Sequence, residues 1–100
     1  MSNSMQFLLV GTLHPDALSG RHPEINRLLE EERAHGRKGY MDGTIRQMWL
    51  QSPDPGAVAI LEASSLEEAR KFASSFPLAQ AGLLEVKVIA LTPYAGFAGA

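Results

Sequence analysis

Apolar and polar positions form short blocks along this chain, and their order predicts four strands and two helices. An apolar run over residues 6–13 predicts a buried strand. Residues 44–52 and 57–64 have strand composition and flank a proline- and glycine-rich turn signal at 53–56, which predicts an antiparallel hairpin. The last strand is expected over residues 83–93.

Two helices are expected between these strands. The first should run from about Pro23 to Gly39 or Tyr40, because proline suits the first turn of a helix. The stretch before it contains two prolines and a glycine and predicts a loop. The second helix should begin at a capping box, residues 65–68, and end before Pro77. Its apolar stripe consists of Leu66, Ala69, Ala73 and Phe76.

The resulting order, β-α-β-β-α-β, predicts an α+β fold, the ferredoxin-like plait. A four-stranded antiparallel sheet carries both helices on one face. We expect one domain over residues 1–100, with its core at about 6–93 and a tail at 94–100. The residues expected on the other sheet face are Gln47, Trp49, Leu61, Ile89 and Leu91. Such an exposed apolar face predicts a homodimer that closes an α+β barrel through its sheets.

The first helix carries three consecutive glutamates, and a helical wheel separates them. Glu30 and Glu31 fall on the solvent side, whereas Glu32 falls within the apolar stripe. That stripe consists of Ile25, Leu28, Leu29, Glu32 and Gly36. A carboxylate in this position is costly unless it is paired or hydrogen-bonded.

Two interpretations of Glu32 remain open. In the first, the side chain points into a pocket between helix and sheet, where burial raises its pKa toward that of a general base. In the second, Glu32 binds Arg33, Arg46 or a backbone N–H and serves only the structure.

Composition narrows the classes of function. The 100-residue chain has a net charge of −2 and no basic block, so no nucleic-acid partner is expected. It contains no cysteine, and no pair among its three histidines has the spacing of a helical metal site, so no metal is expected. No segment approaches the roughly 18 apolar residues of a membrane span. The first residues lack the basic start of a signal peptide, and a cytoplasmic protein is expected.

Four segments in one order resemble the muconolactone isomerase-like group of dimeric α+β-barrel proteins. They are residues 31–33 (EER), 42–49 (DGTIRQMW), 64–69 (SSLEEA) and 76–91 (FPLAQAGLLEVKVIAL). The approach to the last strand is also similar to YCII-related proteins. The resemblance implies a ferredoxin-like subunit, dimerisation through the sheets and a cleft for a small organic molecule.

The resemblance also implies a chemistry, a proton shift within a small unsaturated lactone that needs no cofactor. Glu32 would be the base, Arg46 would face developing negative charge and Trp49 would form an apolar wall. The chain departs from the isomerase at Leu29 and Leu50, where the isomerase has basic residues, and at 79–81, where aromatic residues are missing. The pocket should therefore be less cationic and less aromatic, and we do not expect the same substrate.

Other side chains are weaker candidates for the site. His14 follows the first strand and is either a second acid–base group or a surface histidine. Tyr40 and Tyr94 are candidate substrate-binding residues. Strand alternation places Arg46 and Trp49 on opposite faces unless the strand bulges between them. The sequence leaves open whether the protein is an enzyme or a non-catalytic, ligand-binding or assembly-forming dimer.

Overall fold

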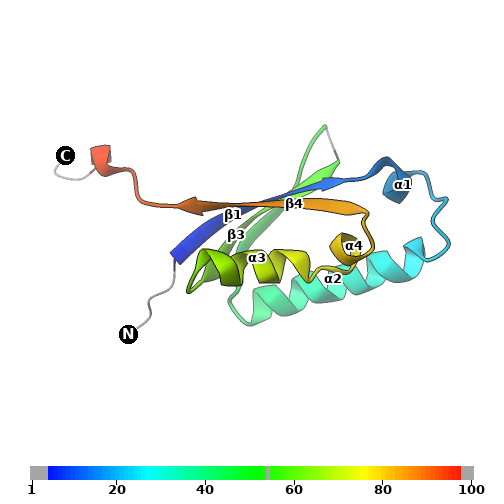
Figure 1. Ribbon diagram of the computed structural model, residues 1–100, viewed down its shortest axis with the longest axis horizontal. Helices are drawn as coiled ribbons and strands as arrows, with labels where there is room; N and C mark the ends of the chain where they lie inside the picture. The colour runs from blue at the N-terminus through cyan, green and yellow to red at the C-terminus, as the bar shows by residue number, and fades with distance from the viewer. Residues whose placement is uncertain (1–4, 54, 98–100) are drawn as a thin grey trace.

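A computed structural model describes residues 5–53 and 55–97 as a two-layer α+β structure. One layer is an antiparallel sheet, and helices α2, α3 and α4 cover one of its faces (Figure 1). The strand order is β2-β3-β1-β4, which is the order of the ferredoxin-like plait and confirms the predicted fold class. The strands are β1 (Met5–Leu13), β2 (Ile45–Leu50), β3 (Gly56–Ala63) and β4 (Leu84–Leu91).

Both predicted helices are present, as α2 (Ile25–Met41) and α3 (Leu66–Ser74). Three short helices were not predicted: α1 (Pro15–Leu18), α4 (Pro77–Gln80) and the 3-10 helix η1 (Ala95–Phe97). Proline occupies the first turn of both α1 and α4, where its missing N–H costs nothing. Pro77 therefore ends α3, as predicted, and also begins α4.

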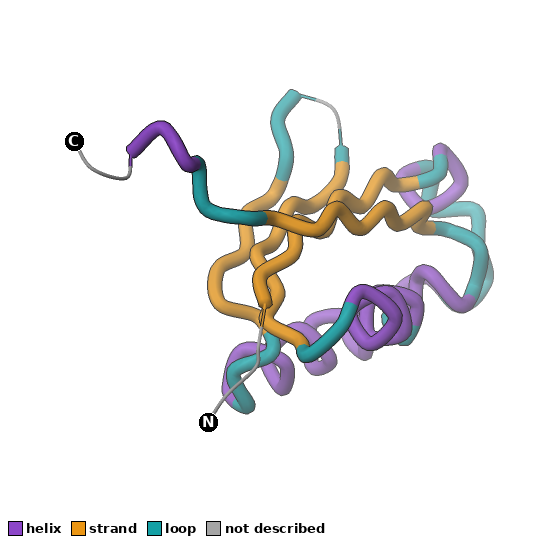
Figure 2. The backbone as a smooth tube through the Cα atoms, turned by 60° about the vertical axis from the view of Figure 1, so that its left-hand side comes forward, coloured by secondary structure: helices purple, strands orange, loops and turns teal. Residues whose placement is uncertain are grey.

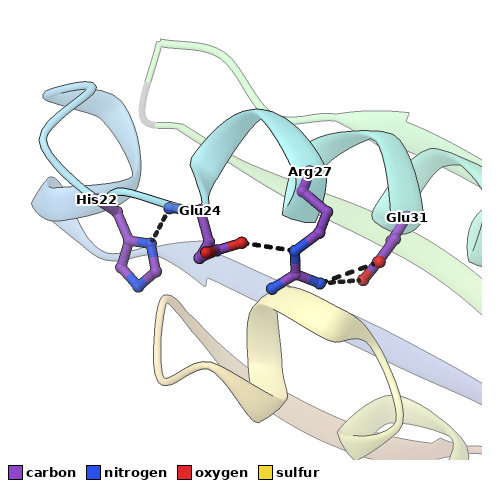
Figure 3. Close-up of polar contacts among 4 residues, drawn as sticks. All are labelled: His22, Glu24, Arg27 and Glu31. Carbon is purple, nitrogen blue, oxygen red and sulfur yellow. Dashed lines mark hydrogen bonds and ion pairs between the residues drawn. The ribbon is translucent and has the colours of Figure 1, made fainter.

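The start of α2 is fixed by an exposed polar network (Figure 3). The His22 imidazole accepts a hydrogen bond from the Glu24 N–H at 3.1 Å. Arg27 donates to Glu24 at 2.6 Å and to Glu31 at 3.0 Å, one turn away on each side. Glu31 therefore lies on the solvent side of α2, as the wheel predicts.

The main core lies between the sheet and α3. Phe7, Leu9, Ala59 and Leu61 project from the two central strands toward the helices and are buried. The prediction that Leu61 lies on the open face of the sheet is wrong. Leu61 is paired with Phe7 and Ile45 in the register and is fully buried with them, because its position in β3 has the same parity as Ala59.

The opposite sheet face, here called the open face, carries many apolar side chains. By register these are Leu8, Val10, Trp49, Val58, Ile60, Ile89 and Leu91. Trp49 is 51% exposed and Ile89 is 39% exposed. In the described part of the chain, α2, α3 and α4 all lie on the other face (Figure 1).

Strand β2 contains a bulge at Arg46. Ile45 pairs with Leu61 and Gln47 pairs with Ile60, so one residue of β2 has no partner in β3. Ile45 consequently faces the helices, while Gln47 and Trp49 face the open side. The sequence analysis placed Arg46 and Trp49 on opposite faces unless the strand bulged between them, and the structure has such a bulge at Arg46.

The chain leaves the sheet after β4 as an extended arm (Figures 1 and 2). Tyr94 and Phe97 pack edge to face there, with ring centroids 4.8 Å apart. Residue 54 of the predicted turn, residues 98–100 of the predicted tail and residues 1–4 lie outside the described residues. Every helix among the described residues is too short or too polar to cross a membrane.

Candidate active site around Glu32

A cavity of about 250 Å³ lies between α2 and the sheet, at the end where β1 stops and β4 begins. Its wall is mostly aliphatic and carries two ionisable groups, Glu32 and Arg33. The lining residues are Leu9, Gly11, Leu13, Leu29, Glu32, Arg33, Met48, Leu50, Gly56, Ala57, Phe76, Leu78 and Leu84. An apolar cavity of about 150 Å³ suffices for benzene, so this one has room for a molecule built on a single ring.

Glu32 is brought to the cavity by the apolar stripe of α2 and held there by α4. The Leu78 N–H donates a hydrogen bond to Glu32 Oε1 at 2.9 Å. Leu78 is in the first turn of α4, where backbone N–H groups have no intrahelical acceptor. No side chain at the N-cap position, Phe76, binds this turn. The carboxylate of one helix therefore caps another.

Burial raises the pKa of Glu32 above its ordinary value of 4.5, and the hydrogen bond from the Leu78 N–H opposes that rise. Glu32 forms no ion pair with another described residue. Glu32 therefore has features of both interpretations that the sequence left open, the cavity-facing base and the structural hydrogen-bond acceptor. It binds a backbone N–H, and it also faces a cavity as a half-buried carboxylate with increased basicity.

The chemistry available in this cavity is that of a single carboxylate in an apolar surrounding. A carboxylate with a raised pKa is suited to accept a proton from a bound molecule near neutral pH. Arg33, which is exposed, is the cationic side chain in the lining. Among the described residues, no group of three or more histidine, cysteine, aspartate or glutamate side chains is placed to hold a metal ion.

The other charged candidates do not belong to the lining of this cavity. Arg46 is exposed at the β2 bulge and does not belong to the lining. His14 is the N-cap of α1, and its Nδ1 accepts a hydrogen bond from the Asp16 N–H at 3.1 Å. Within one subunit, neither side chain is brought together with Glu32.

The aromatic candidates also lie outside the lining of a single subunit. Trp49 is on the open face, opposite the helices. Tyr40 is 64% exposed near the end of α2, and Tyr94 is 68% exposed on the arm. Their predicted roles in substrate binding stay predictions.

The lining includes several residues that the sequence analysis did not assign to a site. Met48 and Leu50 reach the cavity because they alternate with Trp49 along β2. The alternation of side chains along β2 was therefore enough to predict that Met48 and Leu50 face the helices. Leu78 could not be found in this way, because its N–H becomes available only through the unpredicted helix α4.

Comparison with known proteins supports the fold. No family model and no curated protein sequence matches the chain. Among solved structures, muconolactone isomerase superposes with a TM-score of 0.76 at 16% identity, over 96% of this chain and 97% of the isomerase chain. The 5-chloro-2-hydroxyhydroquinone dehydrochlorinase from Burkholderia phenoliruptrix, in complex with 2,5-dihydroxybenzoquinone, gives a TM-score of 0.63 at 19% identity, over 92% of this chain and 98% of that chain.

These likenesses confirm the predicted resemblance to muconolactone isomerase at the level of the fold. The fold is thus shared with two proteins named as small-molecule enzymes. The second resemblance, to YCII-related proteins, stays a prediction.

Proposed function

We propose that this protein is a small-molecule enzyme of the muconolactone isomerase-like class that transfers a proton without a cofactor. The observation that carries the proposal is the half-buried Glu32 carboxylate, which lines a small apolar cavity and has a raised pKa. The substrate class is a small unsaturated acid, lactone or ring compound. Glu32 would take a proton from an activated carbon or hydroxyl of the bound molecule and return it to another position.

The position of the arm after β4 determines which cavity Tyr94 can reach as a substrate-binding residue. The cavity is lined at Leu84, the first residue of β4, whereas Tyr94 follows the other end of that strand. An eight-residue strand spans about 26 Å, so Tyr94 lies too far along the chain to reach the Glu32 cavity of its own subunit. We therefore propose that Tyr94 contacts the molecule bound in the cavity of a neighbouring subunit.

A homodimer through the open face is part of the proposal. The apolar side chains of that face are continuous over the paired strands, which is unusual for a surface that stays in water. A second copy would bury it with a two-fold axis between the sheets. We propose a cytoplasmic protein without a membrane or nucleic-acid partner.

Placing a charge at the centre of the open face should dissociate the proposed dimer. Ile60→Lys would bury an unpaired ammonium group between the two sheets, which is costly. We expect the mass measured by light scattering at micromolar concentration to fall from dimer to monomer. Leu18→Lys, at a 57% exposed position on α1, is the control and should stay dimeric. A monomeric wild-type protein would contradict the proposal.

A second candidate function is supported by the bond between Glu32 and the Leu78 N–H. If capping α4 is the only task of the carboxylate, the protein is a non-catalytic ligand-binding or assembly-forming dimer. Both candidate functions are compatible with this fold. They differ in whether the protein catalyses proton exchange on a bound molecule.

The two candidates are tested by a thermal-shift panel of small unsaturated acids, lactones and hydroxylated rings, followed by proton-exchange measurements on each hit. A ligand present at 100 times its Kd stabilises the native state by about 2.7 kcal/mol. Hits should lose their effect in Met48→Trp, which fills the mouth of the cavity from a 42% exposed position. Hits that bind but show no exchange catalysed by Glu32 would favour the non-catalytic function.

A further inference from the structure

His35 lies one turn after Glu32 on α2 and is in contact with the end of α3. Its Nε2 is 2.8 Å from the Ser75 hydroxyl. Its ring stacks on Phe72, with centroids 5.6 Å apart, and meets the edge of Phe76 at 4.7 Å. Three contacts thus hold one partly buried imidazole against the junction between α3 and α4.

The direction of the hydrogen bond follows from the partners of Ser75. The Ser75 hydroxyl donates to the Phe72 carbonyl oxygen at 2.5 Å, so its own oxygen is left to accept from His35 Nε2–H. Burial lowers the pKa of His35, nearby Lys38 lowers it further, and Asp42 opposes both. His35 is therefore a neutral donor at neutral pH.

The junction between α3 and α4 is consequently held at two points by successive turns of α2. His35 binds Ser75, the C-cap residue of α3, and Glu32 binds the N–H of Leu78 in α4. Phe76 lies between these points, touches His35 and lines the cavity. The two anchors are three residues apart on both segments, so successive turns of α2 bind the same short segment, residues 75–78.

We propose that His35 is a positioning residue for Glu32. Its hydrogen bond to Ser75 fixes the short segment that presents the Leu78 N–H to the Glu32 carboxylate and the Phe76 ring to the cavity. His35 itself does not line the cavity. The consequence for catalysis depends on the proposed function, whereas the positioning can be measured without any substrate.

Three variants separate the hydrogen bond from the packing. His35→Phe keeps a ring against Phe72 and Phe76 but removes the donor, and Ser75→Ala removes the acceptor. His35→Gln places an N–H donor close to the position of Nε2 and should restore the bond. The readouts are hydrogen exchange of the Leu78 amide and the titration of the Glu32 carboxyl carbon, both by NMR.

We expect Leu78 amide exchange to accelerate about two- to tenfold in His35→Phe and Ser75→Ala, which is the effect of losing one hydrogen bond. The Glu32 pKa should rise further, because the opposing Leu78 bond weakens. His35→Gln should return both values toward wild type. A fall of the Glu32 pKa in His35→Phe and Ser75→Ala would contradict the proposal, because weakening of the Leu78 bond raises this pKa.

Leu66→Ala is the matched control, because it removes a half-buried contact with the core at the far end of α3. It should lower stability and leave both NMR readouts unchanged. The proposal is overturned if Leu78 exchange and the Glu32 titration stay at wild-type values in His35→Phe and Ser75→Ala. If both readouts shift while wild-type protein turns over none of the thermal-shift hits, the positioning stands and the proposed catalytic function fails.

Discussion

Replacing Glu32 by glutamine should reduce catalysed proton exchange by about 10²-fold or more while the protein stays folded. Glutamine has nearly the same shape and keeps an oxygen that can accept from the Leu78 N–H, but it cannot take a proton. The measurement is deuterium incorporation from D₂O into a ligand found by thermal shift, followed by NMR. Ligand binding should persist in the variant.

The stability of the same variant should depend on pH in a defined sense. The folded-state pKa of Glu32 lies above 4.5, so protonation favours the fold below pH 4.5 and this contribution is lost as pH rises through the folded-state pKa. Glu32→Gln does not ionise, so in urea unfolding it should gain stability relative to wild type as the pH rises from 4.5 through the folded-state pKa of Glu32. A variant that retains full exchange activity would contradict the role of Glu32 as base.

Gly56→Ala should destabilise the protein by about 3 kcal/mol, at the upper end of the cost of overpacking. Gly56 is buried in β3, and a Cβ atom there would overlap the carbonyl oxygen of Gly11 on the neighbouring strand. Relief requires β1 and β3 to separate at the edge of the cavity, since backbone cannot rotate away. For a domain of this size, Tm should fall by roughly 10–20 °C, measured by calorimetry.

Gly36→Ala provides the comparison for this effect. Gly36 lies within α2, and a Cβ atom there meets nothing within 4 Å. Alanine is favoured over glycine in helices by about 1 kcal/mol, so the variant should be as stable as wild type or more stable. Equal stability of Gly56→Ala and wild type would show that β1 and β3 are not packed as described.

The periodic parts of the chain account for what could be predicted. Each strand and both long helices follow from apolar spacing, because burial of one face fixes that spacing. The wheel placed Glu32 on the buried side of α2 for the same reason. The wheel could not show whether the Glu32 carboxylate caps another helix or faces a cavity. Both depend on the position of α4, which is distant in sequence from Glu32.

The remaining features depend on local backbone geometry or on partners. Helix α4 is four residues long, which is too short to show a period. The bulge at Arg46 changes the face of Ile45 relative to Gln47, and nothing in the composition of β2 marks it. The face of Leu61 was misassigned, although alternation with Ala59 and Ala63 within its strand was enough to place it.

The central claim is that Glu32 is a basic carboxylate facing an apolar cavity, and titration of its carboxyl carbon by NMR tests this most directly. We expect a pKa above 4.5 in the free protein. It should rise further in the presence of benzene, which displaces water from an apolar cavity and donates no strong hydrogen bond. A pKa at or below 4.5 that does not respond to benzene would contradict the account.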